Sequence, residues 1–176
     1  MKLTPTTQKF VLHWGEMGTR WGVNRTVAQI HALLYLTERP LNAEEIADIL
    51  GVARSNVSTS LKELHNWGLV KVVHVLGDRR DHFESLKDVW DIFLVIMDGR
   101  KRRELDPTLT VLRECQLEAD SDQQTPSQVK ARIADTLAFL ELITGWYDQM
   151  KVLPRPTLLK LLRFGAKVQH LIVRKA

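Results

Sequence analysis

The feature that most constrains this chain is residues 42–70, where two amphipathic helical patterns follow each other across a single glycine. The side chain of Asn42 can accept hydrogen bonds from the free amides of a first helical turn, and Glu45, three residues on, can reach back to the amide of Asn42. Apolar side chains then recur at helical spacing up to Gly51, which suits the left-handed residue that ends a helix. The sequence therefore predicts a short helix that closes in a tight turn.

A second helix is predicted from about Arg54 to Trp67, with Val57, Leu61 and Leu64 on the face that meets the core. Its opposite side, and the positions flanking it, carry small polar groups and a cation: Ser55, Asn56, Ser58, Thr59, Lys62 and Asn66. Exposed helices usually favour Glu and Lys, whereas short donors and acceptors suit base edges in a major groove. Arg54 and Lys62 suit phosphates. The alternative is a solvated helix that only packs on its neighbour.

A charged hairpin is predicted directly after this helix. Residues 69–75 are rich in β-branched side chains, and residues 83–86 form a second short run. Between them, Gly77 and Asp78 supply turn chemistry. Arg79 and Arg80 are then placed to enter a minor groove or to grip phosphates. Two helices, a turn and a cationic hairpin in this order are the plan of a winged helix-turn-helix.

With these segments in place, the chain from Phe10 to about Leu117 resembles the multiple-antibiotic-resistance-regulator (MarR) family, and within it the GbsR-like branch. The likeness rests on five linked motifs: Phe10-x-x-x-Trp14-Gly15, residues 53–58, residues 61–64, residues 67–70 and residues 77–84. The resemblance implies a dimeric bacterial transcription regulator, with base contacts from Ser55 to Lys62 and wing contacts from Arg79 and Arg80.

Two positions depart from the family's pattern. Ala53 stands where a serine helix cap is common, and Phe83-Glu84-Ser85 replaces the Leu-Thr that often follows the wing. The first departure weakens one helix cap, and neither removes an expected DNA contact.

The remaining helical patterns predict a mostly α fold class with a small β-wing, in which a winged helix-turn-helix DNA-binding domain is joined to a helical dimerisation region. We expect N-terminal scaffold helices in residues 1–41, the DNA-binding core in 42–86 and the C-terminal dimerisation region in 87–176. So much apolar helix surface needs a partner, and a homodimer would supply it and match a two-fold operator. The intersubunit core is expected to include the last helix and four residues of the helix before it: Val129, Ile133, Leu137 and Leu140.

Composition agrees with a DNA partner without demanding one. The net charge is +4 and the isoelectric point is near 9.3, which favour a polyanion. The lone Cys115 excludes an internal disulfide and fits a reducing cytoplasm. Because no apolar run approaches the roughly 18 residues of a membrane span and the N-terminus lacks a signal-peptide core, we expect a cytoplasmic protein without membrane contact.

An enzyme is disfavoured on the same grounds. Neither a Gly-x-x-x-x-Gly-Lys nor a Gly-x-Gly-x-x-Gly motif occurs, and the 6 histidines lack metal-ligand spacing. We therefore expect no catalytic residue, no metal and no cofactor. His74 and His82, which flank the wing, are expected to be solvated.

The regulatory signal is harder to predict from sequence. The 5 tryptophans offer rings that can hold a quaternary ammonium by cation–π attraction. We expect a repressor controlled by a small effector such as a cationic osmolyte, bound in a cavity lined by Trp14 and Trp90 between the first helix, the helix after the wing and the C-terminal helices. For each ring the alternative is a place in the core or dimer interface. The alternative function for the whole chain is a winged-helix protein-interaction or architectural module without effector control.

Three further patterns concern local structure. Gly15, Gly18 and Gly22 predict either a groove on the first helix where a second helix or a ligand comes close, or a bent helix that tolerates glycine. The basic run 100–103 is expected to stabilise the carboxyl end of a helix, with DNA phosphate as the alternative partner. Residues 125–128, Thr-Pro-Ser-Gln, predict a capping-box helix start with proline at the first helical position.

Overall fold

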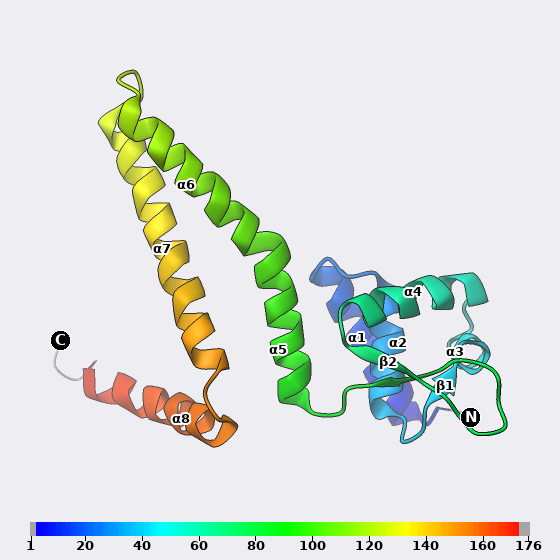
Figure 1. Ribbon diagram of the computed structural model, residues 1–176. Coiled ribbons are helices and arrows are strands. Elements are labelled where there is room, and N and C mark those ends of the chain that lie inside the picture. The colour runs from blue at the N-terminus through cyan, green and yellow to red at the C-terminus, as the bar shows by residue number, and fades with distance from the viewer. Residues whose placement is uncertain (1–2, 173–176) are drawn as a thin grey trace. The chain divides into compact units, whose positions relative to one another are not determined.

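The computed structural model describes residues 3–172 of the chain, with side chains described up to residue 164. The chain falls into two compact units that divide between Gly99 and Arg100, which we call the winged unit and the helical unit. Figure 1 shows the elements of each. The fold class is mostly α with a small antiparallel sheet, as predicted. The expected three-part division at residues 41 and 86 concerns roles rather than compactness, and it stays a prediction.

The winged unit contains five helices and three short strands among its described residues. In chain order these are α1 (Pro5–Arg20), α2 (Arg25–Leu36), β1 (Leu41–Asn42), α3 (Ala43–Leu50), α4 (Arg54–Asn66), β2 (Val70–Val73), β3 (His82–Ser85) and α5 (Val89–Arg100). The fully buried side chains come from several of these elements and form one core: Val11, Ile30, Leu33, Leu34, Leu41, Ile46, Val57 and Leu61. Helix α2 supplies three of them, more than any other element, and is the centre of the unit.

The helix–turn–helix forms as predicted. The side chain of Asn42 accepts hydrogen bonds from the amides of Glu44 and Glu45, both at 3.0 Å, and the carboxylate of Glu45 accepts from the amide of Asn42 at 3.0 Å. Gly51 ends α3 with φ +64°, a left-handed conformation that a Cβ would strain. Ala53 precedes α4 without a side-chain cap, so the weakened cap expected there is confirmed.

The wing is a hairpin whose first strand is shorter than predicted and whose second strand begins one residue earlier than predicted. The sheet has the order β1-β3-β2, and Phe83 of β3 pairs with Leu41 on one side and Val72 on the other, antiparallel in both cases. Between β2 and β3, the amide of Asp78 donates to the carbonyl of Val75 at 3.0 Å. The pleated pairing therefore stops at Val73, and a tight turn forms beyond it.

The two helical glycines of α1 accommodate α2. A Cβ built on Gly15 would lie 2.6 Å from the side chain of Gln29, and one built on Gly18 would lie 2.5 Å from the Cβ of Ala28. Gly22 lies beyond α1, in the turn, with φ +76°. Of the two interpretations of these glycines, the close approach of another helix is the one observed for Gly15 and Gly18.

A lysine joins the segment after the wing to the end of α2. The ammonium group of Lys87 donates to the carbonyls of Leu34, at 2.6 Å, of Tyr35, at 3.1 Å, and of Thr37. These carbonyls lie at the carboxyl end of α2, where the helix dipole favours a cation. Burial lowers the pKa of Lys87.

A buried histidine lies on the same helix. His31 is 4% exposed, and its Nε2 has no hydrogen-bond partner among the described residues. Burial and the nearby charge of Lys87 lower the pKa of His31 to about 4. The neutral imidazole is therefore the form that the fold holds at neutral pH.

The helical unit begins with a π-helical turn rather than a helix end. Helix α5 continues through residues 101–105, which form this turn, into α6 (Asp106–Ser121). The expectation that residues 100–103 lie at the carboxyl end of a helix is therefore wrong. Instead, the ammonium group of Lys101 lies 2.8 Å from the carboxylate of Asp106 and 3.3 Å from that of Asp148.

Helices α6 and α7 (Ser127–Lys151) form a hairpin, and α8 (Arg155–Ile172) follows. The predicted capping box at residues 125–128 is wrong, because Ser127 is the first helical residue and Pro126 precedes it without a side-chain cap. The hydroxyl of Thr125 donates to Asp122 instead, which also accepts from the amide of Gln124 at 2.7 Å. Asp122 thus organises the loop before α7.

The α7 face that meets α6 includes residues expected at an intersubunit core. Leu137 and Thr144 of α7 are buried, as are Leu109 and Ala119 of α6. Leu137 is therefore already covered within its own chain. No helix in the described part of the chain has the length and apolar composition needed to cross a membrane.

Candidate nucleic-acid interface

Helix α4 has a buried face and a polar face that differ sharply. Val57, Leu61 and Leu64 are buried, and the predicted set on and beside the other face is exposed: Ser55, Asn56, Ser58, Thr59 and Lys62. Within the described residues, these five side chains form no hydrogen bond or ion pair. Short donors and acceptors with no internal partner are available to a ligand, which is what base recognition requires.

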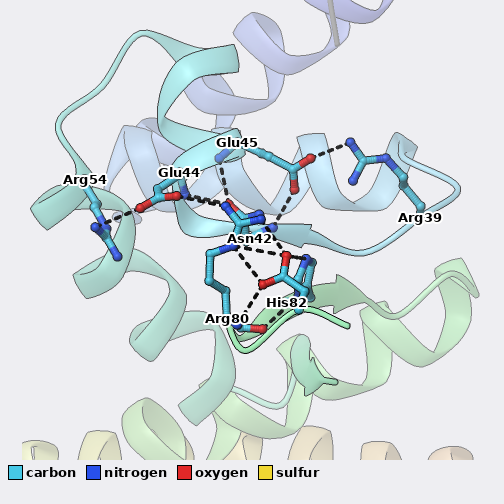
Figure 2. Close-up of polar contacts among 8 residues, drawn as sticks. Arg39, Asn42, Glu44, Glu45, Arg54, Arg80 and His82 are labelled. Atoms are coloured by element: carbon cyan, nitrogen blue, oxygen red, sulfur yellow. Dashed lines mark hydrogen bonds and ion pairs between the residues drawn. The ribbon is translucent and has the colours of Figure 1, made fainter. Parts of the chain in front are cut away.

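One carboxylate joins α3, α4 and the wing. Glu44, on the first turn of α3, lies 3.0 Å from a guanidinium nitrogen of Arg54 through one oxygen and 3.0 Å from Arg80 through the other. Figure 2 shows Glu44 between these two arginines. All three side chains are partly exposed, so this is a surface bridge that positions the arginines rather than a large source of stability.

A second carboxylate holds Arg80 from within the hairpin. Asp78 accepts from the amide of Arg80 at 3.0 Å and from two guanidinium nitrogens, the shortest contact being 2.6 Å. Hydrogen bonds from Arg80 hold the pKa of Asp78 well below its usual range, and the two carboxylates raise the pKa of Arg80. Arg80 is therefore a fixed cation at the base of the turn.

Arg79 differs from its neighbour. It is exposed, and it makes no hydrogen bond or ion pair with any residue that the structure describes. The two wing arginines therefore have different surroundings: Arg80 is held between carboxylates, whereas Arg79 extends into solvent.

The two wing histidines also differ. His74 is exposed, as expected, but His82 is buried, and the prediction that it is solvated is wrong. Its Nδ1 lies 2.9 Å from the carbonyl oxygen of Arg80, so this nitrogen is the donor. Its Nε2 lies 3.6 Å from the carboxylate of Asp78. His82 thus supports the backbone that carries Arg80.

Sequence reasoning missed Glu44, Asp78 and His82 as parts of this site. The Asp78–Arg80 spacing of two residues was a usable signal, since an aspartate commonly bonds the backbone two residues on. The contact between Glu44 and Arg80 spans 36 residues, and no local pattern indicates it.

The predicted effector residues make ordinary aromatic contacts. Trp14 stacks on Phe10 with ring centroids 5.3 Å apart, and Trp90 meets the edge of Phe93 at 6.1 Å. Two cavities, one in each unit, have volumes of about 350 and 430 Å³, and neither is lined by Trp14 or Trp90. In the described residues no group of three or more His, Cys, Asp or Glu is arranged to hold a metal ion.

The helix–turn–helix, the polar outer face of α4 and the arginine-bearing hairpin define a winged helix-turn-helix domain. A family model described as MarR family matches residues 21–81, which run from the turn after α1 into the wing. Over this region the chain is similar to MarR-family proteins, and over a longer stretch it is similar to GbsR.

Individual relatives agree. The HTH-type transcriptional repressor GbsR of Bacillus subtilis (strain 168) is 22% identical over 134 residues, which are 74% of each chain. The HTH-type transcriptional regulator YvaV of the same organism is 20% identical over 79 residues, 45% of each chain. A crystal structure of a transcriptional regulator matches 82% of this chain and 99% of its own with a TM-score of 0.54 at 22% identity, which supports the fold.

Proposed function

We propose that this protein is a cytoplasmic, sequence-specific repressor that binds a pseudo-palindromic operator as a homodimer. The observation that carries the proposal is the set of exposed, internally unpartnered side chains on α4, next to arginines that Glu44 holds together. MarR regulators bind DNA, and a relative that matches 74% of the chain is named a repressor.

The proposed contacts fall into two classes. Ser55, Asn56, Ser58 and Thr59 would lie against base edges in the major groove, where their short donors and acceptors distinguish sequences. Arg54, Lys62, Arg79 and Arg80 would lie against phosphates or in the flanking minor groove and supply most of the salt-dependent affinity.

The exposed face of α7 supports a dimer in which the helical unit takes part. Four large apolar side chains recur there at helical spacing and are exposed: Phe139, Leu142, Ile143 and Trp146. They lie opposite Leu137 and Thr144, which are buried. Because exposed apolar surface of this kind marks association sites, we place the intersubunit core on this face rather than on the stripe around the buried Leu137 that the sequence suggested.

The test uses the full chain and the duplex that it selects from a random-sequence pool. Replacing Arg79 and Arg80 together with alanine should weaken binding to every sequence and flatten its salt dependence. Replacing Asn56 with alanine should instead change the preference among sequences. A matched control replaces Lys9 and Arg132, two exposed cations distant from the wing in sequence, and removes the same charge.

The outcomes separate the candidate functions. If the wing variant binds with the affinity and salt slope of the Lys9 and Arg132 control, the assignment of DNA contacts is wrong. If the unmodified chain binds no duplex, the winged domain serves as a protein-interaction or architectural module.

We also propose that a small cationic osmolyte controls DNA binding, with Trp14 and Trp90 as the rings that would face it. A ligand that binds one arrangement of the recognition helices better than another would shift the operator affinity. Calorimetry with choline, and operator titrations with and without it, test this. Absence of heat together with an unchanged operator affinity would reject the cationic effector.

A further inference from the structure

The tip of the wing carries an aliphatic side chain where solvent contact is greatest. Leu76 is 104% exposed, the largest value among the exposed large apolar residues that the structure describes. Val75 beside it is 40% exposed, and Val72 on β2 is 38% exposed. Three exposed aliphatic side chains therefore lie along the outer strand and the turn of the hairpin, and Leu76 is the most exposed of them.

The turn presents Leu76 in a defined position. Leu76 and Gly77 are the two central residues of the turn closed by the bond from the amide of Asp78 to the carbonyl of Val75. Gly77 has φ +85°, as the third residue of a type II turn requires. Asp78 and Arg80 then fix the returning strand to Glu44 on α3. Leu76 is thus held at the tip of a turn that hydrogen bonds and ion pairs keep in place.

Two cationic residues lie close to Leu76 in the sequence. Arg79 follows three residues later and makes no ion pair within the described residues, and Arg80 is the fixed cation beside it. An aliphatic side chain flanked by cations is the combination with which proteins enter a minor groove, because the cations meet the phosphates and the apolar group meets the sugars and base edges.

We propose that Leu76 is an apolar wedge that enters the minor groove of duplex DNA when α4 lies in the major groove. This inference rests on the proposed function. A protein partner is disfavoured because Leu76 and its two valine neighbours form a narrow edge rather than a broad patch of the size that protein docking uses.

The wedge and the arginines predict different dependences on salt. Each phosphate contact that is lost lowers the slope of log affinity against log salt by about 1. An apolar contact displaces no counterion, so its loss lowers the affinity at every salt concentration by the same factor. The two contributions of the wing can therefore be measured separately.

The experiment compares three variants on the duplex that the wild-type chain selects from a random pool. Leu76→Gln keeps the size of the side chain and makes it polar, and it should weaken binding about tenfold with an unchanged salt slope. Leu76→Met keeps it apolar and should bind within about twofold of wild type. Arg79→Ala should lower the slope by about 1. Thermal melting checks that each variant folds.

Hydroxyl-radical footprinting adds a second measurement, since it reports the sugars that face the minor groove. Leu76→Gln should lose protection of the sugars in the minor groove that flanks each half-site, while protection of guanine N7 in the major groove against methylation by dimethyl sulfate persists. Unchanged affinity and footprint in Leu76→Gln, or equal losses in Leu76→Gln and Leu76→Met, would overturn the wedge and leave the proposed function intact. If wild type bound no duplex, both would fail.

Discussion

The winged unit and the helical unit bury their apolar residues to very different degrees. In the winged unit, large side chains such as Leu33 and Ile46 are inaccessible to solvent and form one core. In the helical unit, Leu109, Ala119 and Leu137 are buried, while Phe139, Leu142 and Trp146 remain exposed. The comparison teaches that the winged unit completes its own core, whereas the helical unit leaves apolar surface that a second copy would cover.

The largest expected effect concerns the core of the winged unit. Leu33→Ala removes a buried side chain from α2 and leaves a cavity, so we expect the free energy of unfolding to fall by about 3–4 kcal/mol. Urea denaturation at fixed protein concentration measures it. Leu36→Ala is the matched control on the same helix, because Leu36 is partly exposed, and it should cost less than about 1 kcal/mol. Equal losses would contradict the self-sufficient core.

The second prediction concerns the exposed face of α7. Replacing Leu142 and Trp146 together with glutamate should raise the dimer dissociation constant by about a hundredfold, because two charges would enter an apolar interface. Sedimentation over a range of concentrations measures this, and circular dichroism should show unchanged helix content. Ala134→Glu is the control, because Ala134 lies about 80° around α7 from Leu142 and about 120° from Trp146. A stable dimer of the double variant would place the interface elsewhere.

The third prediction concerns His31 and pH. The unfolded chain binds a proton at His31 near pH 6.5, whereas the folded chain resists it until about pH 4. The contribution of His31 to the free energy of unfolding is therefore nearly constant above pH 6.5 and falls by about 3 kcal/mol as the pH drops to 4. The carboxylates of Asp78 and Glu45 have pKa values lowered from 3.8 and 4.5, so their contributions to stability are present above those values and are lost as the pH falls below them.

Urea denaturation between pH 7.5 and pH 4.5 tests the role of His31. His31→Phe should remove most of this dependence, and the exposed His74→Ala should leave it unchanged. If His31→Phe keeps the full pH dependence, another group carries it.

The smallest expected effect concerns Glu44. Its carboxylate competes with phosphate for Arg54 and Arg80, so Glu44→Gln should raise the affinity for duplexes of random sequence by about threefold. The ratio between the selected duplex and random duplexes should fall accordingly. Fluorescence anisotropy with both duplexes measures it. Weaker binding to both would mean that orientation of the wing outweighs the competing charge.

Sequence predicted the parts of the fold that depend on neighbouring residues. The capping box at Asn42, the left-handed Gly51 and the two faces of α4 all follow from spacings of a few residues. The burial of Leu137 could not be predicted in the same way, because an amphipathic stripe does not reveal whether its partner is the same chain or a second copy. The π-helical turn at residues 101–105 likewise leaves no pattern that distinguishes it from a helix end.

The residues of the candidate site also fall into those that the sequence predicted and those that depend on tertiary structure. The exposed residues of α4 and the wing arginines were predicted from helix periodicity and turn chemistry. The bridge through Glu44 depends on where the hairpin folds back over α3, which is a tertiary property. His82 was misassigned because its position beside charged residues indicates solvent, whereas the pairing of β3 with β1 and β2 covers it.

Lys87 determines how the wing can move. Its ammonium group ties the chain just after β3 to the last carbonyls of α2, the most buried helix of the unit. These hydrogen bonds hold the end of the hairpin in place, so bending of the wing is confined to the residues between β2 and β3. A force applied at Leu76 would bend that short span and would be carried to the rest of the unit by Lys87, by the bridge from Arg80 to Glu44 and by the pairing of β3 with β1.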